Sequence, residues 1–234
     1  MLTLCKNAAF GLLHLFYPHT CAGCGDIIAQ NNQSICLQCF LDLPETNFQH
    51  IAGNAIEKIF YGRLKIDKAM AGYFFSKDSS LQHIIHAFKY ERNTDACLQM
   101  GKWLGLLIQQ SSRMEGIDCL IPMPIHDSRE KKRGYNQAAI LCEGIQSVTG
   151  IPFYSDLVVR MKETETQTRK SRMDRWQNVQ SGFMVKNASL LAGKHILLVD
   201  DVITTGATLE ACGEVILKAN PASLSITALA WASE

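Results

Sequence analysis

One run of thirteen residues constrains the fold of this chain more than any other: it reads LLVDDVITTGATL and spans Leu197 to Leu209. The apolar residues up to Val199 are typical of a buried strand, and the residues from Thr208 onward are typical of a helix. Two carboxylates, Asp200 and Asp201, and a threonine-rich loop lie between them. The run therefore predicts a strand, a polar loop over 200–206 and a helix in succession.

The order of strand, loop and helix recurs along the chain. Apolar spacing predicts strands at 69–75, 119–121, 195–199 and 224–231, and helices at 81–90, 97–108, 135–148 and 208–218. Strands that alternate with helices favour an α/β fold with a mostly parallel sheet and helices on both faces. Ligands of such folds gather beyond the carboxyl ends of the strands.

The loop after the two carboxylates is suited to bind a phosphate. Backbone N–H groups where a helix begins attract anions, threonine hydroxyls add donors, and glycine lets the backbone close on a ligand. Carboxylates repel a phosphate, so we expect Asp200 and Asp201 to accept hydrogen bonds from sugar hydroxyls or to hold Mg²⁺ indirectly. The combination favours a ribose 5-phosphate. The residues that offer the loop's donors are Thr204, Thr205, Gly206, Ala207 and Thr208.

Ordinary capping is the alternative explanation of this loop, because Asp and Thr often cap loops and helices. One cap needs one such residue, whereas five polar side chains fall within nine positions here. A nucleotide-hydrolysing P-loop needs the pattern G-x4-G-K-[ST], which the sequence does not contain. We therefore expect no ATP-driven motor.

Four of the nine cysteines form a second motif near the N-terminus. A C-x2-C pair is followed by eleven residues and another C-x2-C pair, a pattern that predicts a closed, structural zinc site with four thiolates. Ordinary thiols or a redox-active pair are the alternatives. We treat residues 1–50 as a zinc-ribbon-like module that is too small to fold without metal. The four predicted ligands are Cys21, Cys24, Cys36 and Cys39.

Composition and charge narrow the class of protein further. With 47% hydrophobic and 19% charged residues the chain is typical of a globular protein, and its net charge of +1 gives no global attraction to nucleic acid. The only apolar run near the N-terminus, Ala8 to Tyr17, is about half the ~20 residues that a membrane span needs. It also lacks a cleavage site of the secretory type. We expect a cytoplasmic protein without a membrane span.

The thirteen-residue run resembles the signature of type I phosphoribosyltransferases, which bind 5-phosphoribosyl-1-pyrophosphate (PRPP) with Mg²⁺. This resemblance implies that Asp200 and Asp201 contact the ribose hydroxyls and that residues 204–208 enclose the 5-phosphate. Pro122 and Met123, at an earlier strand end, resemble the family's pyrophosphate loop. We expect Lys89 and Arg133 to neutralise the pyrophosphate. Residues 51–234 are then the phosphoribosyltransferase-like domain.

The cysteine module joined to this signature resembles the ComF family of competence proteins over almost the whole chain. The likeness includes Lys89-Tyr90, the 122–124 run and the run from Arg133 to Gln137. It continues through Arg160, Lys162, Thr164, Gln167, Arg172, Arg175, Asn178 and Val179. It implies a role in natural transformation, with single-stranded DNA, a helicase-like protein and recombination-loading proteins as partners, and it suggests homodimers. The alternative is a metabolic phosphoribosyltransferase, for which the sequence names no acceptor.

The sequence holds two basic loops, 129–133 and 160–175, and the longer one is the candidate for a nucleic-acid contact. Neighbouring acids cancel part of their charge, so a solvated, salt-bridged face is the alternative. Tyr135 and Trp176 are aromatic residues beside these loops that are able to stack on bases. The residues predicted to follow a DNA backbone are Arg169, Lys170, Arg172, Arg175 and Trp176.

Overall fold

The computed structural model of the chain describes residues 19–28, 33–161 and 182–232. The predictions about 8–17 and about the basic residues 169–176 therefore lie outside the described residues. The strands are β1 (Ala69–Phe74), β2 (Cys119–Pro122), β3 (Val158–Arg160), β4 (Phe183–Val185), β5 (His195–Ile203) and β6 (Ser223–Trp231). The α-helices are α2 (Leu37–Leu41), α3 (Ala55–Phe60), α4 (Ser80–Tyr90), α5 (Thr94–Gln109), α6 (Asp127–Arg133), α7 (Gln137–Thr149) and α9 (Ala207–Leu217). Short 3-10 turns occupy Phe48–His50, Ser112–Met114 and Ala188–Leu190.

A four-stranded parallel sheet in the order β1-β6-β5-β2 forms the centre of the molecule. This confirms the predicted α/β fold, and each predicted strand and helix is present with shifts of a few residues at its ends. One boundary was wrong: Asp200 and Asp201 belong to β5, because β5 stays paired with β6 from His195 to Ile203. The polar loop therefore begins only after Ile203 and is shorter than predicted.

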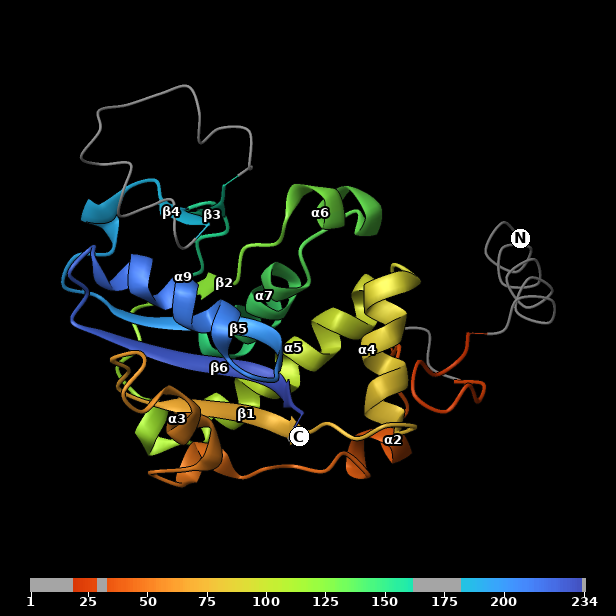
Figure 1. The fold of residues 1–234 in the computed structure, drawn as a ribbon. Helices are drawn as coiled ribbons and strands as arrows, with labels where there is room; N and C mark the ends of the chain where they lie inside the picture. The colour runs from red at the N-terminus through yellow and green to blue at the C-terminus, as the bar shows by residue number, and fades with distance from the viewer. Residues whose placement is uncertain (1–18, 29–32, 162–181, 233–234) are drawn as a thin grey trace, which may run out of the picture.

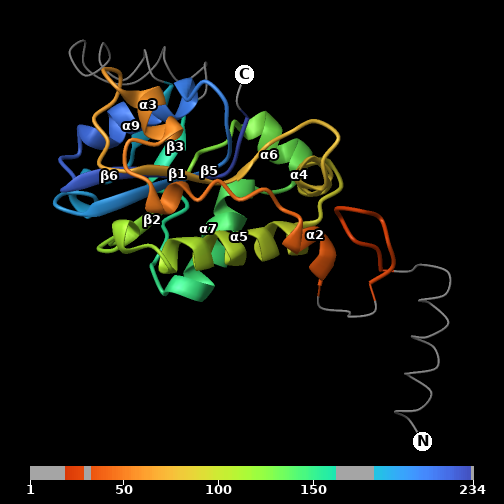
Figure 2. The ribbon, with the colours of Figure 1, turned by 90° about the horizontal axis from the view of Figure 1, so that it is seen from below.

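Helices cover both faces of the sheet, as predicted (Figure 1). Alternate residues of β1 point to opposite faces, so Met70 packs with the core that includes α4, α5 and α7, while Ala69 and Ala71 pack with the core that includes α3 and α9. Figure 2 shows α5 and α7 on one side of the sheet and α3 and α9 on the other. Both faces are thus buried, which explains the continuous apolar runs of the strands.

The basic segment 129–133, predicted to be a loop, is part of helix α6. The His126 side chain caps its start by accepting the Ser128 N–H, and Gly134 ends it with a left-handed backbone at φ 88°. Acidic residues lie in its first turn and basic residues in its last turn, which suits the helix dipole. The prediction failed because α6 buries none of its residues and so leaves no apolar spacing in the sequence.

The cysteine module packs against the same core as α4 and α5. The Gln99 side chain of α5 accepts the N–H groups of Ser34 and Ile35, and His83 of α4 hydrogen-bonds the Gly23 carbonyl at 3.0 Å. Cys21 and Cys39 are buried in that core. None of the described helices is both long and apolar enough to cross a membrane.

Candidate functional site

A cavity of about 270 Å³ opens at the carboxyl ends of β2 and β5. This is the edge of the sheet where an α/β fold binds its ligands. Two carboxylates and four Lys or Arg side chains line the cavity. Carboxylates accept hydrogen bonds from hydroxyls and the cations attract phosphates, so the lining suits a ligand that has both groups. The charged and polar residues that line the cavity are Lys89, His126, Arg129, Arg133, Asn136, Gln137, Arg160, Asp200, Asp201 and Thr208.

The two carboxylates differ in their surroundings. The Oδ2 atom of Asp201 lies 2.8 Å from the Nζ atom of Lys89, and both side chains are largely buried, with 16% and 18% of their surface exposed. Among the described residues no cation forms an ion pair with Asp200, and its Oδ1 atom accepts the Asp201 N–H at 2.8 Å. The β5 backbone therefore brings two acids to the cavity, of which one is already neutralised by a lysine.

Burial and then the neighbouring Asp201 charge raise the pKa of Asp200, the Asp201 N–H and Lys89 lower it, and the net result is a pKa of about 7. This carboxyl therefore holds its proton to a higher pH than an ordinary aspartate does. A group in this state accepts a hydroxyl hydrogen bond best once it has lost its proton. Strongly shifted carboxyls of this kind are typical of ligand-binding sites.

The threonine loop is held from outside the cavity by α3 and the residues after it. Gly206 is buried with φ 72°, and a Cβ atom there would lie only 2.8 Å from the Ile59 side chain. Arg63 donates to the Thr205 carbonyl at 3.1 Å and forms an ion pair with Glu210 of α9. The N-cap residue Gly206 has no side chain to cap α9. Among the described residues, the one side-chain acceptor for an N–H of its first turn is a distant one, Thr205 Oγ1 at 3.5 Å from the Ala207 N–H, so this end of the helix favours an anion.

The segment after β2 supplies the opposite wall. Met123 continues the pairing with β5 through its N–H, which donates to the Val199 carbonyl at 2.7 Å, and Asn136 donates to the Met123 carbonyl at 3.0 Å. Arg133 donates to the Oε1 atom of Gln137 at 2.8 Å. Because arginine is only a donor, the other amide atom of Gln137 must be Nε2, and this buried atom has no partner among the described residues. A bound acceptor would satisfy it.

The structure brings together six of the predicted PRPP-site residues around one cavity. Pro122 ends β2 and is buried, and Thr204, Thr205, Gly206 and Ala207 belong to the adjoining loop without lining this cavity. The sequence analysis missed the contributions of Arg129, Arg160 and the Gln137 amide. The predicted residues that do line it are Lys89, Met123, Arg133, Asp200, Asp201 and Thr208.

The four cysteines of the N-terminal module fit a zinc ion. Their Sγ atoms all lie within 4.8 Å of one another, and Cys24 and Cys36 are 3.8 Å apart. A tetrahedron with Zn–S bonds of about 2.3 Å has edges of about 3.8 Å. Burial opposes ionisation of Cys21, but N–H donors from Cys36, Cys24 and Gly23 outweigh it and lower the pKa to about 7. Backbone donors of this kind stabilise a thiolate.

Comparison with known proteins adds to this geometry. Residues 131–233 match the family model described as the phosphoribosyl transferase domain. Competence protein F of Haemophilus influenzae is 28% identical over 95% of this chain and 94% of its own length. The chain is a relative of the ComF competence proteins. The resemblance and the type I phosphoribosyltransferase-like fold, both predicted from the sequence, are thereby confirmed.

Two further relatives extend the comparison. The DNA utilization protein YhgH of Escherichia coli O6:H1 is 26% identical over 86% of either chain. Competence protein ComFC of Bacillus subtilis is 36% identical over 107 residues, which cover 45% of the chain described here and 41% of ComFC. The match to Competence protein F covers nearly the whole chain, so it includes both the cysteine module and the cavity.

Gly206→Ala tests whether α3 shapes the threonine loop. We expect the added methyl to lower the free energy of unfolding by about 1–3 kcal/mol, because it is strained at positive φ and meets the Ile59 side chain. Gly150→Ala is the matched control, since Gly150 has φ 75° and open space around it. Chemical denaturation measures both variants. Equal losses would show that the contact with α3 contributes nothing.

Proposed function

We propose that this protein acts in natural transformation as a PRPP-binding protein that handles incoming single-stranded DNA in the cytoplasm. The single observation that carries the PRPP part is the cavity in which the paired acids of β5 face cationic side chains and the start of α9. The names of the relatives, Competence protein F and DNA utilization protein, support the role in transformation.

Each part of PRPP has matching groups in this proposal. Asp200 and Asp201 accept the ribose hydroxyls, and residues 204–208 hold the 5-phosphate with N–H and hydroxyl donors. Arg133 and Lys89, with the loop at Pro122 and Met123, face the pyrophosphate. Mg²⁺, when bound, neutralises the pyrophosphate and makes it a better leaving group.

A zinc ion on the four cysteines has a structural role in this proposal. Four thiolates leave no open coordination position, so the ion does no chemistry on a substrate. Residues 1–50 serve as the module that carries it, and residues 51–234 as the domain that carries the PRPP cavity. The partners that we propose are single-stranded DNA, a helicase-like protein and recombination-loading proteins, with homodimers as the assembly.

Calorimetric titration tests the PRPP part directly. We expect saturable binding of PRPP in the presence of Mg²⁺. An assay of pyrophosphate release across a panel of nucleobases then separates the proposal from the metabolic alternative. Turnover with one base would favour the enzyme, and absence of any binding heat would overturn the proposal.

Gln137→Leu tests the wall that faces the pyrophosphate. The buried Nε2 atom has no partner among the described residues, so we expect it to donate to a pyrophosphate oxygen. Removal of one such hydrogen bond should weaken inorganic pyrophosphate about 5- to 30-fold and leave ribose 5-phosphate unchanged. Gln146→Leu on the same helix is the control. Equal affinities for pyrophosphate in both variants would exclude this contact.

A further inference from the structure

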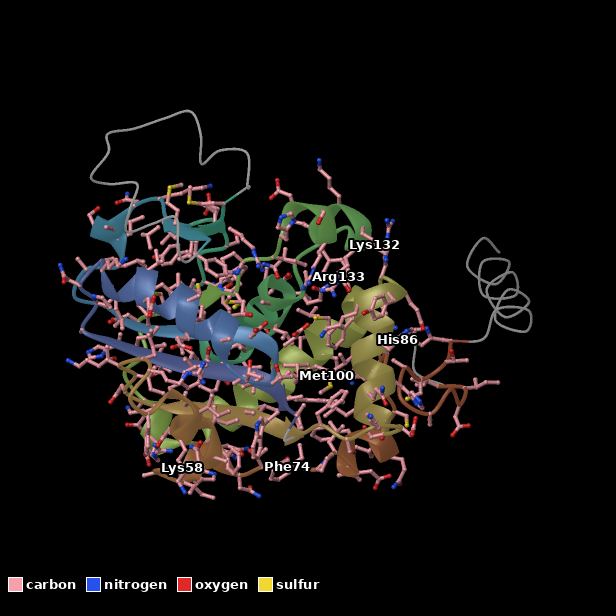
Figure 3. The ribbon with its side chains drawn as sticks, in the orientation of Figure 1. Lys58, Phe74, His86, Met100, Lys132 and Arg133 are labelled. Carbon is pink, nitrogen blue, oxygen red and sulfur yellow. The ribbon has the colours of Figure 1, made fainter. Side chains whose placement is uncertain are left out.

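A second cavity, of about 370 Å³, adjoins the PRPP cavity where α4 approaches α6. It is lined by Lys89, Tyr90, Arg129, Lys132 and Arg133, and no carboxylate of the described residues lines it. Lys89, Arg129 and Arg133 also line the PRPP cavity, so the two cavities share a cationic wall. Figure 3 shows Lys132 and Arg133 of α6 on the same side of the molecule as His86 of α4.

Two of the cations on this surface have neither an ion pair nor a side-chain hydrogen bond among the described residues. Lys89 pairs with Asp201, and Arg133 donates to Gln137. The side chains of Arg129 and Lys132, by contrast, make neither an ion pair nor a hydrogen bond with any described residue, and both are exposed. Exposed cations that face one another repel, and an anion that binds between them removes this repulsion. The lining therefore favours a ligand with phosphate charges.

Tyr90 makes this surface different from a plain anion site. The residue is 59% exposed, although it lies at the end of a helix whose other face is fully buried. The His86 ring lies 4.7 Å from the Tyr90 ring, and the Arg133 guanidinium lies 5.9 Å from its centre. These two contacts hold the ring in place and leave much of its surface open. A held, exposed aromatic ring beside cations is typical of surfaces on which nucleic-acid bases stack.

We propose that this α4–α6 surface binds single-stranded DNA, with a base on Tyr90 and the backbone phosphates on Lys132 and Arg129. The strand must be single, because the bases of a duplex are stacked on each other and offer no free face to a tyrosine. This inference rests on the proposed role in DNA handling and names the surface for it. That surface is distinct from the basic residues 169–176 predicted from the sequence, and it places the strand at the mouth of the PRPP cavity.

The test uses two residues that line the second cavity but not the PRPP cavity, Lys132 and Tyr90. We expect Lys132→Glu and Tyr90→Ala each to raise the Kd for a fluorescent oligothymidine about tenfold, and Tyr90→Phe to keep most of the affinity. Lys132→Glu should also reduce the salt dependence of binding, by a slope of roughly 0.7 for each lost phosphate contact. Anisotropy titrations at several salt concentrations measure these changes.

Lys58→Glu is the control, because it makes the same charge reversal on α3, far from α6 (Figure 3). It should bind the oligonucleotide like the wild type. Titration with PRPP and Mg²⁺ reports whether the neighbouring cavity is intact in each variant, and thermal melting reports folding. We expect both to match the wild type in Lys132→Glu and Tyr90→Ala.

Three results would overturn the proposal. If the wild type binds the oligonucleotide and both variants bind it equally well, the strand lies elsewhere and only this surface is wrong. If Lys132→Glu weakens binding but Tyr90→Ala does not, the surface attracts anions without stacking a base. If the wild type binds no oligonucleotide at all, the proposed role in DNA handling fails together with the surface.

Discussion

Asp200→Asn should abolish measurable PRPP binding and at the same time raise the melting temperature at pH 8. The loss follows from the proposed function, in which this carboxylate accepts sugar hydroxyls: the variant replaces it by a neutral amide, and two charge-assisted hydrogen bonds are worth about 3–6 kcal/mol in total. The gain follows because burial and the Asp201 charge raise the pKa of Asp200 to about 7 in the folded protein. Folding therefore opposes the ionisation of this carboxyl.

The direction of the pH dependence follows from proton binding. The unfolded carboxyl has a pKa near 4, so between about pH 4 and pH 7 the folded protein holds more protons than the unfolded chain. Stability is therefore lost as the pH rises through this window, and the loss is complete above pH 7. We expect the advantage of Asp200→Asn over the wild type to be largest at pH 8 and small at pH 4.5.

Asp201→Asn is the matched comparison for this experiment. It removes the partner of Lys89 from a largely buried ion pair, so we expect a lower melting temperature at pH 8. Thermal melting at the two pH values, without ligand, measures both variants. If Asp200→Asn melts at or below the wild-type temperature at pH 8, the ionised Asp200 carboxylate does not destabilise the folded protein. Asp200 is then a structural residue.

Cys24→Ser should remove bound zinc and lower the melting temperature by roughly 10 °C, the shift that a loss of about 3–5 kcal/mol produces in a domain of this size. The Cys24 side chain is exposed, so loss of the thiol alone has little effect on packing. We expect the loss from an incomplete ligand set, because the proposed structural zinc would hold the shape of the module that packs on α4 and α5.

Zinc content by elemental analysis and the melting temperature are the two measurements. Cys212→Ser is the control: it alters a fully buried thiol in the other core, which costs stability but leaves the four ligands intact. This control should keep one zinc per chain. Full zinc content in Cys24→Ser, or a melting temperature equal to that of the wild type, would contradict a structural metal on these four cysteines.

Helix α6 is an element that the sequence alone did not predict. Strands such as β5 and helices such as α4 bury one or both faces, so their apolar spacing is written in adjacent residues and is readable without a structure. Helix α6 buries nothing and is stabilised by its cap at His126 and by its charge order. The stabilisation from a cap and from the helix dipole is small and local. The sequence of α6 therefore shows only a basic run, which is equally typical of a loop.

The cavity shows the same division between local and distant information. The strand, acidic pair and threonine loop that end in α9 are contiguous, so the sequence alone identified them, and the two cysteine knuckles are local in the same way. The ion pair between Lys89 and Asp201, by contrast, joins helix α4 to strand β5, which are more than a hundred residues apart in the sequence. It forms because the tertiary fold brings α4 to the end of β5. The spacing of apolar residues along the sequence does not predict a contact between residues so far apart.

What the sequence by itself determined was the set of residue types: two acids followed by a threonine-glycine loop at a strand end, and four cysteines at the spacing of metal ligands. What only the tertiary structure decided was the state of those groups. It set the raised pKa of Asp200, the Nε2 atom of Gln137 without a partner among the described residues, and the exposed ring of Tyr90 beside Arg133. The physical reason is that residue types are local properties, whereas burial, pairing and exposure depend on which distant segments fold against them.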